Sequence, residues 1–225
     1  MIFAVVNQKG GCGKTTTAVH LAHYLQQKGH TVCLIDCDPQ KSSSNWLEGA
    51  TNSGHLTIEY EVVDLGQSLA IDKSLMRLEK HFDYIVIDGP AGLVEQTMTL
   101  IQLSDKVLIP LQPSALDIDA VHHTVETIEM ARRRCPTINA SVFLNRIRKN
   151  TVMLRAAEET ITDFEERGIN VLAEKIADRI QLSRICAEQR TAFLENTGPG
   201  FEAQHEYKAL FDAFVFGGAQ LTLAA

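Results

Sequence analysis

The eight residues KGGCGKTT at positions 9–16 constrain the fold of this chain more than any other feature of its sequence. They follow a short apolar run at residues 2–6 and lead into residues 15–28, where apolar side chains recur at helical spacing. This order predicts a strand, a glycine-rich loop and a helix. Glycines let the backbone wrap closely around a phosphate, and the N-terminus of a helix favours an anion. The segment therefore predicts a phosphate-binding loop.

Two side chains of this loop indicate its chemistry. Lys14 can reach the β and γ phosphates of a nucleotide, and Thr15 offers a hydroxyl to a magnesium ion that bridges them. Cys12 is expected to be passive. The predicted nucleotide-binding residues of the loop are Lys9, Gly10, Gly11, Cys12, Gly13, Lys14, Thr15 and Thr16.

The rest of the chain alternates short β-rich runs with helical patterns. Further strands are expected at residues 31–35, 84–87, 106–111 and 140–144, and further helices at 94–103, 116–134, 153–167, 179–189 and 202–214. Such alternation predicts an α/β three-layer sandwich, in which helices cover both faces of a mainly parallel, twisted sheet. The polar stretch 48–54 is expected to be a surface connection. We expect a single domain over residues 1–225, with 213–225 as an edge element or a loose tail.

Composition narrows the class of protein. Hydrophobic residues make up 45% and charged residues 22%, as in ordinary globular domains. The net charge of −7 argues against a surface coated in positive potential but allows a local basic patch. The five cysteines include no CxxC pair, which suits a reducing compartment. The N-terminus lacks the pattern of a signal peptide, and no apolar run approaches the ~20 residues that span a bilayer. These features favour a cytoplasmic protein.

Three aspartates stand where two predicted strands end. Asp36 and Asp38 follow the second strand, and Asp88 follows the run at residues 84–87. Because the carboxyl ends of parallel strands meet at one edge of a sheet, these side chains are expected near the phosphate-binding loop. Carboxylate oxygens suit magnesium and its water shell, although an aspartate at a strand end can also simply form a turn.

The loop departs from the ordinary pattern GxxxxGK[ST], because Gln8 rather than glycine stands five residues before Gly13. Lys9 instead matches the deviant Walker A signature KGGxGK[ST], and here the sequence resembles the ParA/MinD family of ATPases. The resemblance continues through LIDCDPQ at 34–40, DYIVIDGP at 83–90 and LIPLQPS at 108–114. These blocks and the short chain look most like the small ParA proteins of plasmid partition and cargo positioning.

This resemblance implies an ATPase with ATP and Mg²⁺ as ligands. It assigns Asp38 to the water that attacks ATP, and Asp88 to the Walker B carboxylate that holds magnesium through its water shell. Asp36 and Thr15 belong to the surroundings of the metal in the same scheme. The implied metal residues are therefore Thr15, Asp36 and Asp88.

The resemblance also implies that Lys9 reaches across an ATP-bound homodimer to the phosphates of the other subunit, as an arginine finger would. The implied catalytic residues are Lys9, Lys14 and Asp38. Hydrolysis would be slow and would time disassembly. The dimer would bind nucleoid DNA without sequence preference, and a ParB-like or other cargo adaptor would stimulate hydrolysis.

Signals for the base and for DNA are weaker. Asn145, at the end of a predicted strand, is a candidate for the adenine edge, with a plain turn asparagine as the alternative. The basic residues Arg146, Arg148, Lys149 and Arg155 are candidates for phosphate contacts with duplex DNA, and Arg179, Arg184 and Arg190 form a second set. Either set also fits a solvated helix face.

Two further groups are predicted to have no role in the chemistry. Arg132, Arg133 and Arg134 precede a proline and suit the C-terminus of a helix. The histidines at positions 20, 23, 122 and 123 have no cysteine or carboxylate at ligand spacing, so we expect them on helix surfaces rather than at a metal.

Two other functions remain open at this point. A MinD-like ATPase would dock on a membrane through a C-terminal amphipathic helix, but the sequence has no lysine or arginine after Lys208. A metabolic amidase or synthetase on the same core would need a substrate pocket. The sequence does not name the cargo of a positioning ATPase.

Overall fold

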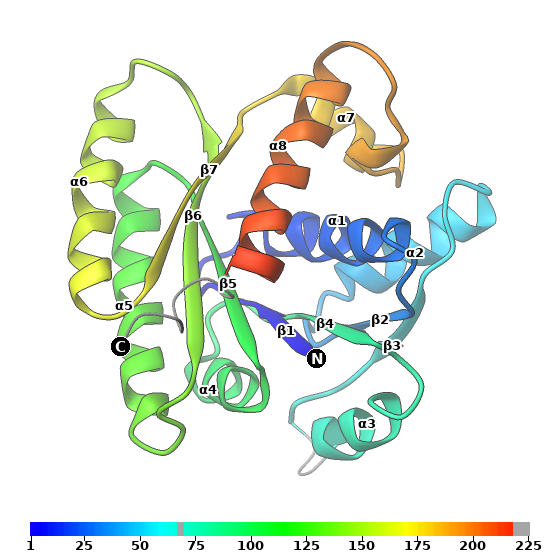
Figure 1. The fold of residues 1–225 in the computed structure, drawn as a ribbon, viewed down its shortest axis with the longest axis horizontal. Helices are drawn as coiled ribbons and strands as arrows, with labels where there is room; N and C mark the ends of the chain where they lie inside the picture. The colour runs from blue at the N-terminus through cyan, green and yellow to red at the C-terminus, as the bar shows by residue number, and fades with distance from the viewer. Residues whose placement is uncertain (67–69, 218–225) are drawn as a thin grey trace.

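The computed structural model describes residues 1–66 and 70–217, and a parallel β-sheet forms its centre (Figure 1). Within these residues seven strands pair in the order β3-β2-β4-β1-β5-β6-β7, and every neighbouring pair is parallel. The strands are β1 (Ile2–Val5), β2 (Val32–Asp36), β3 (Glu59–Val62), β4 (Tyr84–Asp88), β5 (Lys106–Leu111), β6 (Asn139–Ile147) and β7 (Asn170–Ala177). The predicted α/β sandwich is confirmed.

Helices cover both faces of this sheet. They are α1 (Lys14–Gln27), α2 (Ser42–Asn52), α3 (Ala70–Leu78), α4 (Val94–Leu103), α5 (Ala115–Arg132), α6 (Val152–Glu166), α7 (Ile180–Ala187) and α8 (Gly198–Phe216), with a short 3₁₀ turn at Ala192–Leu194. Alternate residues of β1 face opposite sides: Ile2 and Ala4 join the core under α3 to α6, whereas Phe3 and Val5 join the core under α1, α2 and α8. Figure 1 shows α5 and α6 side by side in one layer, and α1 and α2 beyond the opposite face.

The register of the central strands sets the position of the functional residues. Asp36 of β2 pairs with Asp88 of β4, and Val5 of β1 pairs with Asp88 from the other side. The segments that follow β1, β2 and β4 therefore begin at the same level of the same edge. In a parallel sheet this carboxyl edge is where ligands bind.

The expectation of a surface connection at 48–54 is wrong, because α2 continues to Asn52. Its serines and asparagines are poor helix formers, so the sequence of α2 does not show a clear helical pattern. Burial of Trp46, Leu47 and Ala50 against the core stabilises the helix nevertheless. The prediction also omitted α3, β3 and β7. Both strands lie at the edges of the sheet, and β3 is mostly exposed, so neither has the continuous apolar run of a buried strand.

The expectation that the histidines of α1 lie on its surface is also wrong. His20 is fully buried, with Nδ1 2.7 Å from the carbonyl oxygen of Thr16, and its Nε2 accepts a hydrogen bond from the N–H of Ala192 at 3.0 Å. This pattern assigns a neutral ring with its proton on Nδ1. Burial lowers the pKa of His20 to about 3 and that of His23 to about 4. Among the described residues no group of three or more histidine, cysteine or acidic side chains could hold a metal ion.

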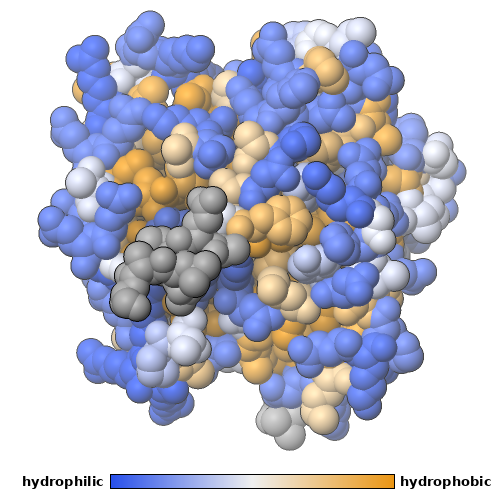
Figure 2. Space-filling model, viewed as in Figure 1, coloured by the Kyte–Doolittle hydropathy of each residue, from blue (hydrophilic) through white to orange (hydrophobic). Residues whose placement is uncertain are grey.

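Helix α8 ends the described part of the chain. Residues 213–216, which the sequence suggested for an edge element or tail, form its last turn, and Lys106 donates to the carbonyl oxygens of Phe214 and Val215 at 3.0 and 2.9 Å. The remainder of that stretch, 218–225, lies outside the described residues. Figure 2 shows a mostly hydrophilic rim on this face and hydrophobic side chains toward its middle. None of the described helices is both long and apolar enough to cross a membrane.

Candidate functional site

The loop between β1 and α1 has the geometry of an anion-binding site. Gly11 and Gly13 have φ values of 78° and 100°, in the left-handed region that favours glycine. At Gly13 the space is also restricted, since a Cβ there would lie 2.3 Å from Nδ2 of Asn145. Helix α1 begins directly afterwards at Lys14, so its free N–H groups adjoin the loop.

The two lysines of the loop have different environments. Lys14 is 6% exposed, and its ammonium donates to the carbonyl oxygen of Lys9 at 2.8 Å. Lys9 turns to α5 instead and forms an ion pair with Asp117, a buried residue that also accepts a hydrogen bond from Ser114. In this arrangement Lys14 lies within the loop, whereas the Lys9 side chain, 31% exposed, leaves it at the surface.

Asp36 and Asp88 lie side by side beneath the loop and are both fully buried. Both oxygens of Asp36 accept backbone N–H groups, from Asp38 at 3.0 Å and from Ser44 at 2.8 Å. Asp36 therefore ties the β2–α2 turn to the start of α2, as the turn alternative anticipated. Asp88 differs, because neither of its oxygens has a hydrogen-bond partner within the described residues.

The environment of Asp88 suits a hydrated cation. Burial raises the pKa of this carboxyl to about 7, and the Asp36 carboxylate adds to the shift, whereas the neighbouring Thr15 and Ser43 hydroxyls and Lys14 oppose it. The Ser43 hydroxyl is also buried without a hydrogen-bond partner in the described structure. These orphaned oxygens fit a magnesium ion with its water shell, and they would hold it through Asp88, Thr15 and Ser43.

Asp38 lies at the rim of the site. Its Oδ1 accepts the N–H of Gln40 at 2.9 Å, and the side chain is half-buried. It lines a cavity of about 670 Å³ together with Lys14, Thr15 and Trp46. The carboxylate is therefore on the same cavity as the phosphate-binding loop, which is where a water-orienting group must lie.

A second cavity, of about 290 Å³, lies on the other side of the loop apex. The two cavities share Gly11, Gly13 and Thr16, and the smaller one is lined also by Asn145 and Tyr207. Together they form a groove divided by the loop. One part adjoins Asp38 and the N-terminus of α1, and the other adjoins the ends of β6 and β7, so the groove can hold an elongated ligand with an anionic end.

Asn145 contacts the loop directly. Its Nδ2 donates to the carbonyl oxygen of Cys12 at 2.9 Å, and its Oδ1 is buried without a partner among the described residues. The adenine contact stays a prediction, but the asparagine is not a plain turn residue, because its amide is buried against the loop. Burial also raises the pKa of the Cys12 thiol, in keeping with a passive role for this cysteine.

The two sets of basic residues proposed for DNA differ in their ion pairs. Arg179 pairs with Glu202 and Glu206, and Arg184 pairs with Glu188. The remaining member of this set, Arg190, pairs with Glu188 and Glu195. These arginines are neutralised locally, which favours the structural role that the sequence left open.

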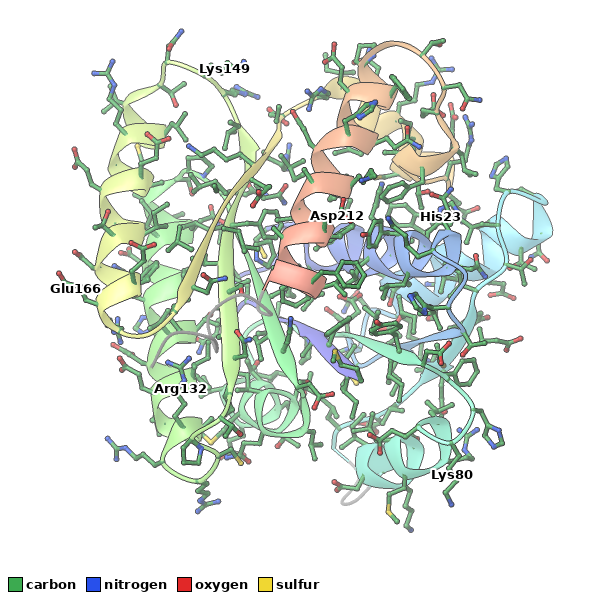
Figure 3. The ribbon with its side chains drawn as sticks, viewed as in Figure 1. His23, Lys80, Arg132, Lys149, Glu166 and Asp212 are labelled. Atoms are coloured by element: carbon green, nitrogen blue, oxygen red, sulfur yellow. The ribbon has the colours of Figure 1, made fainter. Side chains whose placement is uncertain are left out.

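The first set of basic residues, at the β6–α6 connection, has more positive charge that no carboxylate of the described residues neutralises. Arg146 and Arg148 share the single carboxylate of Asp178, at 3.3 and 2.7 Å. Lys149 and Arg155 form no ion pair within the described part of the chain. Figure 3 shows Lys149 in the loop beyond the end of β6, extending outward, with Arg132 near the opposite end of α5. There Arg132 donates to the carbonyl oxygens of Ile138, Arg167 and Gly168, which confirms its structural role.

Sequence reasoning missed three residues of the site, which are Ser43, Gln112 and Asp117. Ser43 adjoins Asp88, and Gln112 donates to the carbonyl oxygen of Gly11 at 2.7 Å. The block PLQPSALD contains Gln112 and Asp117, and its position across the end of a strand was a usable signal. Their partners lie over 100 residues away and could not be read from local spacing.

The parallel sheet, the glycine loop and the buried carboxylates at its carboxyl edge define an α/β nucleotide-binding domain of the phosphate-loop class. Residues 3–192 match the family model described as the CobQ/CobB/MinD/ParA nucleotide binding domain. The chain belongs to this family.

One relative and two solved structures illustrate the similarity. The chain is 33% identical over 177 residues to the "Maintenance of carboxysome distribution protein A" of Halothiobacillus neapolitanus, covering 78% of this chain and 79% of that protein. The apo McdA structure from Cyanothece superposes with a TM-score of 0.74 at 17% identity, covering 94% of this chain and 98% of the other. Cobyrinic acid a,c-diamide synthase from Mycobacterium smegmatis, with an ATP analogue and magnesium, gives 0.71 at 21% identity, covering 95% and 93%. At these identities the two structures show a shared fold.

Proposed function

We propose that this protein is a magnesium-dependent ATPase of the ParA type, which switches between an ATP-bound dimer and a monomer to position a cargo. The observation that carries the proposal is that the loop has two lysines in different places. Lys14 lies inside the loop, and Lys9 lies at its outer surface. The name of the carboxysome distribution relative supports a positioning role for a protein of this sequence type. The ATP analogue and magnesium in the diamide synthase support the choice of ligands.

The orphaned amide oxygen of Asn145 supports adenine over guanine. Its Nδ2 donates one hydrogen to Cys12, while its Oδ1, unpartnered among the described residues, offers an acceptor to a base in the smaller cavity. Adenine presents an exocyclic amino group that donates a hydrogen bond, whereas guanine presents a carbonyl at the same position. Asn145 would then accept a hydrogen bond from the base through Oδ1 while it donates one to the loop through Nδ2.

Hydrolysis needs an aligned water and neutralised phosphate charge more than it needs a covalent step. Asp38 orients the attacking water from the rim of the larger cavity, and Lys14 stabilises charge on the phosphates. Magnesium, when bound, supplies further charge neutralisation, and Asp88, Thr15 and Ser43 hold its surroundings. Lys9 contributes charge to the nucleotide of a second subunit.

The face around the loop supports a second copy as the partner. Exposed apolar side chains stand at the starts of four helices along the carboxyl edge of the sheet, where most surface positions of a free monomer are polar. Three of them are strongly exposed, at 86%, 81% and 72% for Ile180, Val152 and Leu116. The full set is Leu93, Val94, Leu116, Val152, Met153 and Ile180. Dimerisation on this face would bury these side chains and bring Lys9 of each subunit toward the other's nucleotide.

The proposal extends to DNA through Arg146, Arg148, Lys149 and Arg155. These residues gather at the β6–α6 connection, on the same edge as the nucleotide groove, so dimerisation would place two copies of the basic cluster on one assembly. Doubling the cations raises affinity for a phosphate backbone without reading its sequence. The protein would then associate with the nucleoid in the cytoplasm, and an adaptor on the cargo would stimulate hydrolysis.

The test is a salt titration of the protein on random-sequence duplex DNA with ATP, with ADP and without nucleotide. Binding only with ATP, weakening steeply as salt rises, is the expected result. Equal binding in all three states would contradict the switch. No DNA binding in any state would favour the other two functions, and vesicle pelleting with ATP would separate the membrane-associated function from the metabolic one.

A further inference from the structure

The carbonyl groups of the phosphate-binding loop accept hydrogen bonds from donors of the protein itself. Side-chain amides hold two successive carbonyls: Gln112 Nε2 donates to Gly11 at 2.7 Å, and Asn145 Nδ2 donates to Cys12 at 2.9 Å. The carbonyls of Gly13 and Lys9 are held within the loop region itself. The Gly13 oxygen accepts the N–H of Thr17 at 2.9 Å, and the Lys9 oxygen accepts the Lys14 ammonium at 2.8 Å.

This arrangement orients the peptide planes of the loop. In a trans peptide the C=O of one residue and the N–H of the next point in opposite directions. A carbonyl fixed away from the groove therefore turns the following N–H toward it. Holding the oxygens of Gly11 and Cys12 fixes the N–H groups of Cys12 and Gly13, which are donors that an anion in the loop requires.

A loop with three glycines would not hold these planes unaided. Glycine visits more backbone conformations than any other residue, and a peptide that flips would present its carbonyl oxygen to a phosphate. Leu111 and Leu144 pair across β5 and β6, so Gln112 and Asn145 are the next residues along two neighbouring strands. The sheet thus places two side-chain amide donors next to each other, and each donates to one of two consecutive peptides of the loop.

We propose that Gln112 is a positioning residue for phosphate binding, acting through the Gly11 carbonyl together with Asn145 on the next peptide. Gln112 touches no ligand in this role. Its amide sets the direction of the Cys12 N–H before the ligand arrives, so its contribution falls on the affinity for phosphates. The inference rests on nucleotide binding at this loop and is independent of dimerisation and DNA binding.

The test compares Gln112→Met, which keeps the size of the side chain and removes the donor, with Gln26→Met. Gln26 is a matched control, because its Nε2 also donates to a backbone carbonyl at 2.7 Å, that of Thr57, away from the loop. The ligands are ATP and inorganic tripolyphosphate, followed by calorimetry, and urea unfolding of each variant measures stability. Tripolyphosphate has no base, so it reports on the loop alone.

Gln112→Met is expected to lower the affinity for ATP and the affinity for tripolyphosphate by the same factor, about fivefold to tenfold. Gln26→Met is expected to bind both ligands with wild-type affinity. Gln112→Glu is expected to weaken both further, because a carboxylate there repels the carbonyl and the phosphates. Wild-type affinity of Gln112→Met for both ligands would overturn the inference, and so would a loss confined to ATP. A wild-type chain that bound no ATP would overturn the proposed function as well, so the two failures are distinguishable.

Discussion

Lys9 and Asp117 form an ion pair within one chain, 108 residues apart in sequence, that joins the phosphate-binding loop to the first turn of α5. Asp117 is nearly fully buried, and its Oδ1 has no partner among the described residues. The proposed dimer requires Lys9 to reach another subunit. The Lys9–Asp117 pair must therefore open when two ATP-bound chains form the proposed dimer. While the pair is closed, it opposes dimerisation.

Removing the carboxylate charge tests this opposition. Asp117→Asn is expected to strengthen ATP-dependent dimerisation about thirtyfold, because the partly exposed pair contributes ~1 kcal/mol to each of the two monomers that join. Sedimentation velocity across protein concentrations measures the dimer dissociation constant. Asp119→Asn, an exposed aspartate on the same helix, is the control. A dimer no tighter than that of the control would mean that the pair does not compete with assembly.

Lys14→Met is expected to weaken ATP binding at least a hundredfold, since a buried lysine beside the phosphates supplies charge that no other loop side chain supplies. Trp46 is the one tryptophan of the sequence and lines the larger cavity, so its fluorescence reports binding there. Lys80→Met, on an exposed lysine beyond α3, is the control. Retention of wild-type ATP affinity by Lys14→Met would remove this lysine from its role.

Asp38→Asn is expected to separate binding from hydrolysis. The amide cannot orient and polarise water as a carboxylate does, so the ATPase rate should fall about a hundredfold or more while ATP affinity stays near the wild-type value. The variant should accumulate as an ATP-bound dimer. Phosphate release and sedimentation with ATP measure the two properties. Hydrolysis at the wild-type rate would show that another group positions the water.

The DNA surface is tested by removing its unpaired cations. The double substitution Lys149→Ala and Arg155→Ala is expected to weaken DNA binding and to lower the slope of log affinity against log salt by about 2, because two phosphate contacts disappear. The matched control is Arg184→Ala, whose guanidinium pairs with Glu188 in the same helical region. If the control lowered the salt slope as much as the double variant, the proposed surface would be misplaced.

The buried histidines predict an acid-sensitive fold. The pKa of His20 is about 3 and that of His23 about 4 in the native state, against 6.5 for the ordinary side chain. Below pH 6.5 the unfolded chain binds protons that the native chain does not, so the free energy of unfolding falls as pH falls toward 4. The raised pKa of Asp88 acts in the opposite direction between pH 3.8 and about 7.

A variant isolates the histidine contribution. His20→Gln is expected to reduce the dependence of unfolding free energy on pH by up to ~1.4 kcal/mol per pH unit between pH 4 and 6, relative to the wild type. Urea unfolding at several pH values in the absence of magnesium measures it, with the exposed His81→Gln as the control. Equal pH dependence in His20→Gln and the wild type would show that His20 is protonated in the native state.

Local patterns predicted the parts of the fold that depend on neighbouring residues. The loop at 9–16 and helix α1 were predicted because a strand, a glycine-rich loop and a helix follow one another within 30 residues. Asp88 was predicted because it ends a buried strand. Helix α2 was missed because tertiary burial of Trp46 and Leu47, rather than the propensity of its serines, stabilises it.

The contacts that complete the site depend on strand order. Lys9 meets Asp117, and Gly11 meets Gln112, only because β5 lies next to β1 in the sheet. The Asn145 contact with Cys12 further requires β6 to lie next to β5. Sequence spacing indicates that these residues follow strands, but it does not say which strands are neighbours.

Sedimentation velocity of the wild type and of Lys9→Ala, each with a non-hydrolysable ATP analogue and magnesium, tests the central claim most directly. The account predicts that both chains bind the analogue, that the wild type forms a dimer which ADP does not support, and that Lys9→Ala remains a monomer. A Lys9→Ala dimer as tight as that of the wild type, or a wild type that stays monomeric with the analogue bound, would contradict the account.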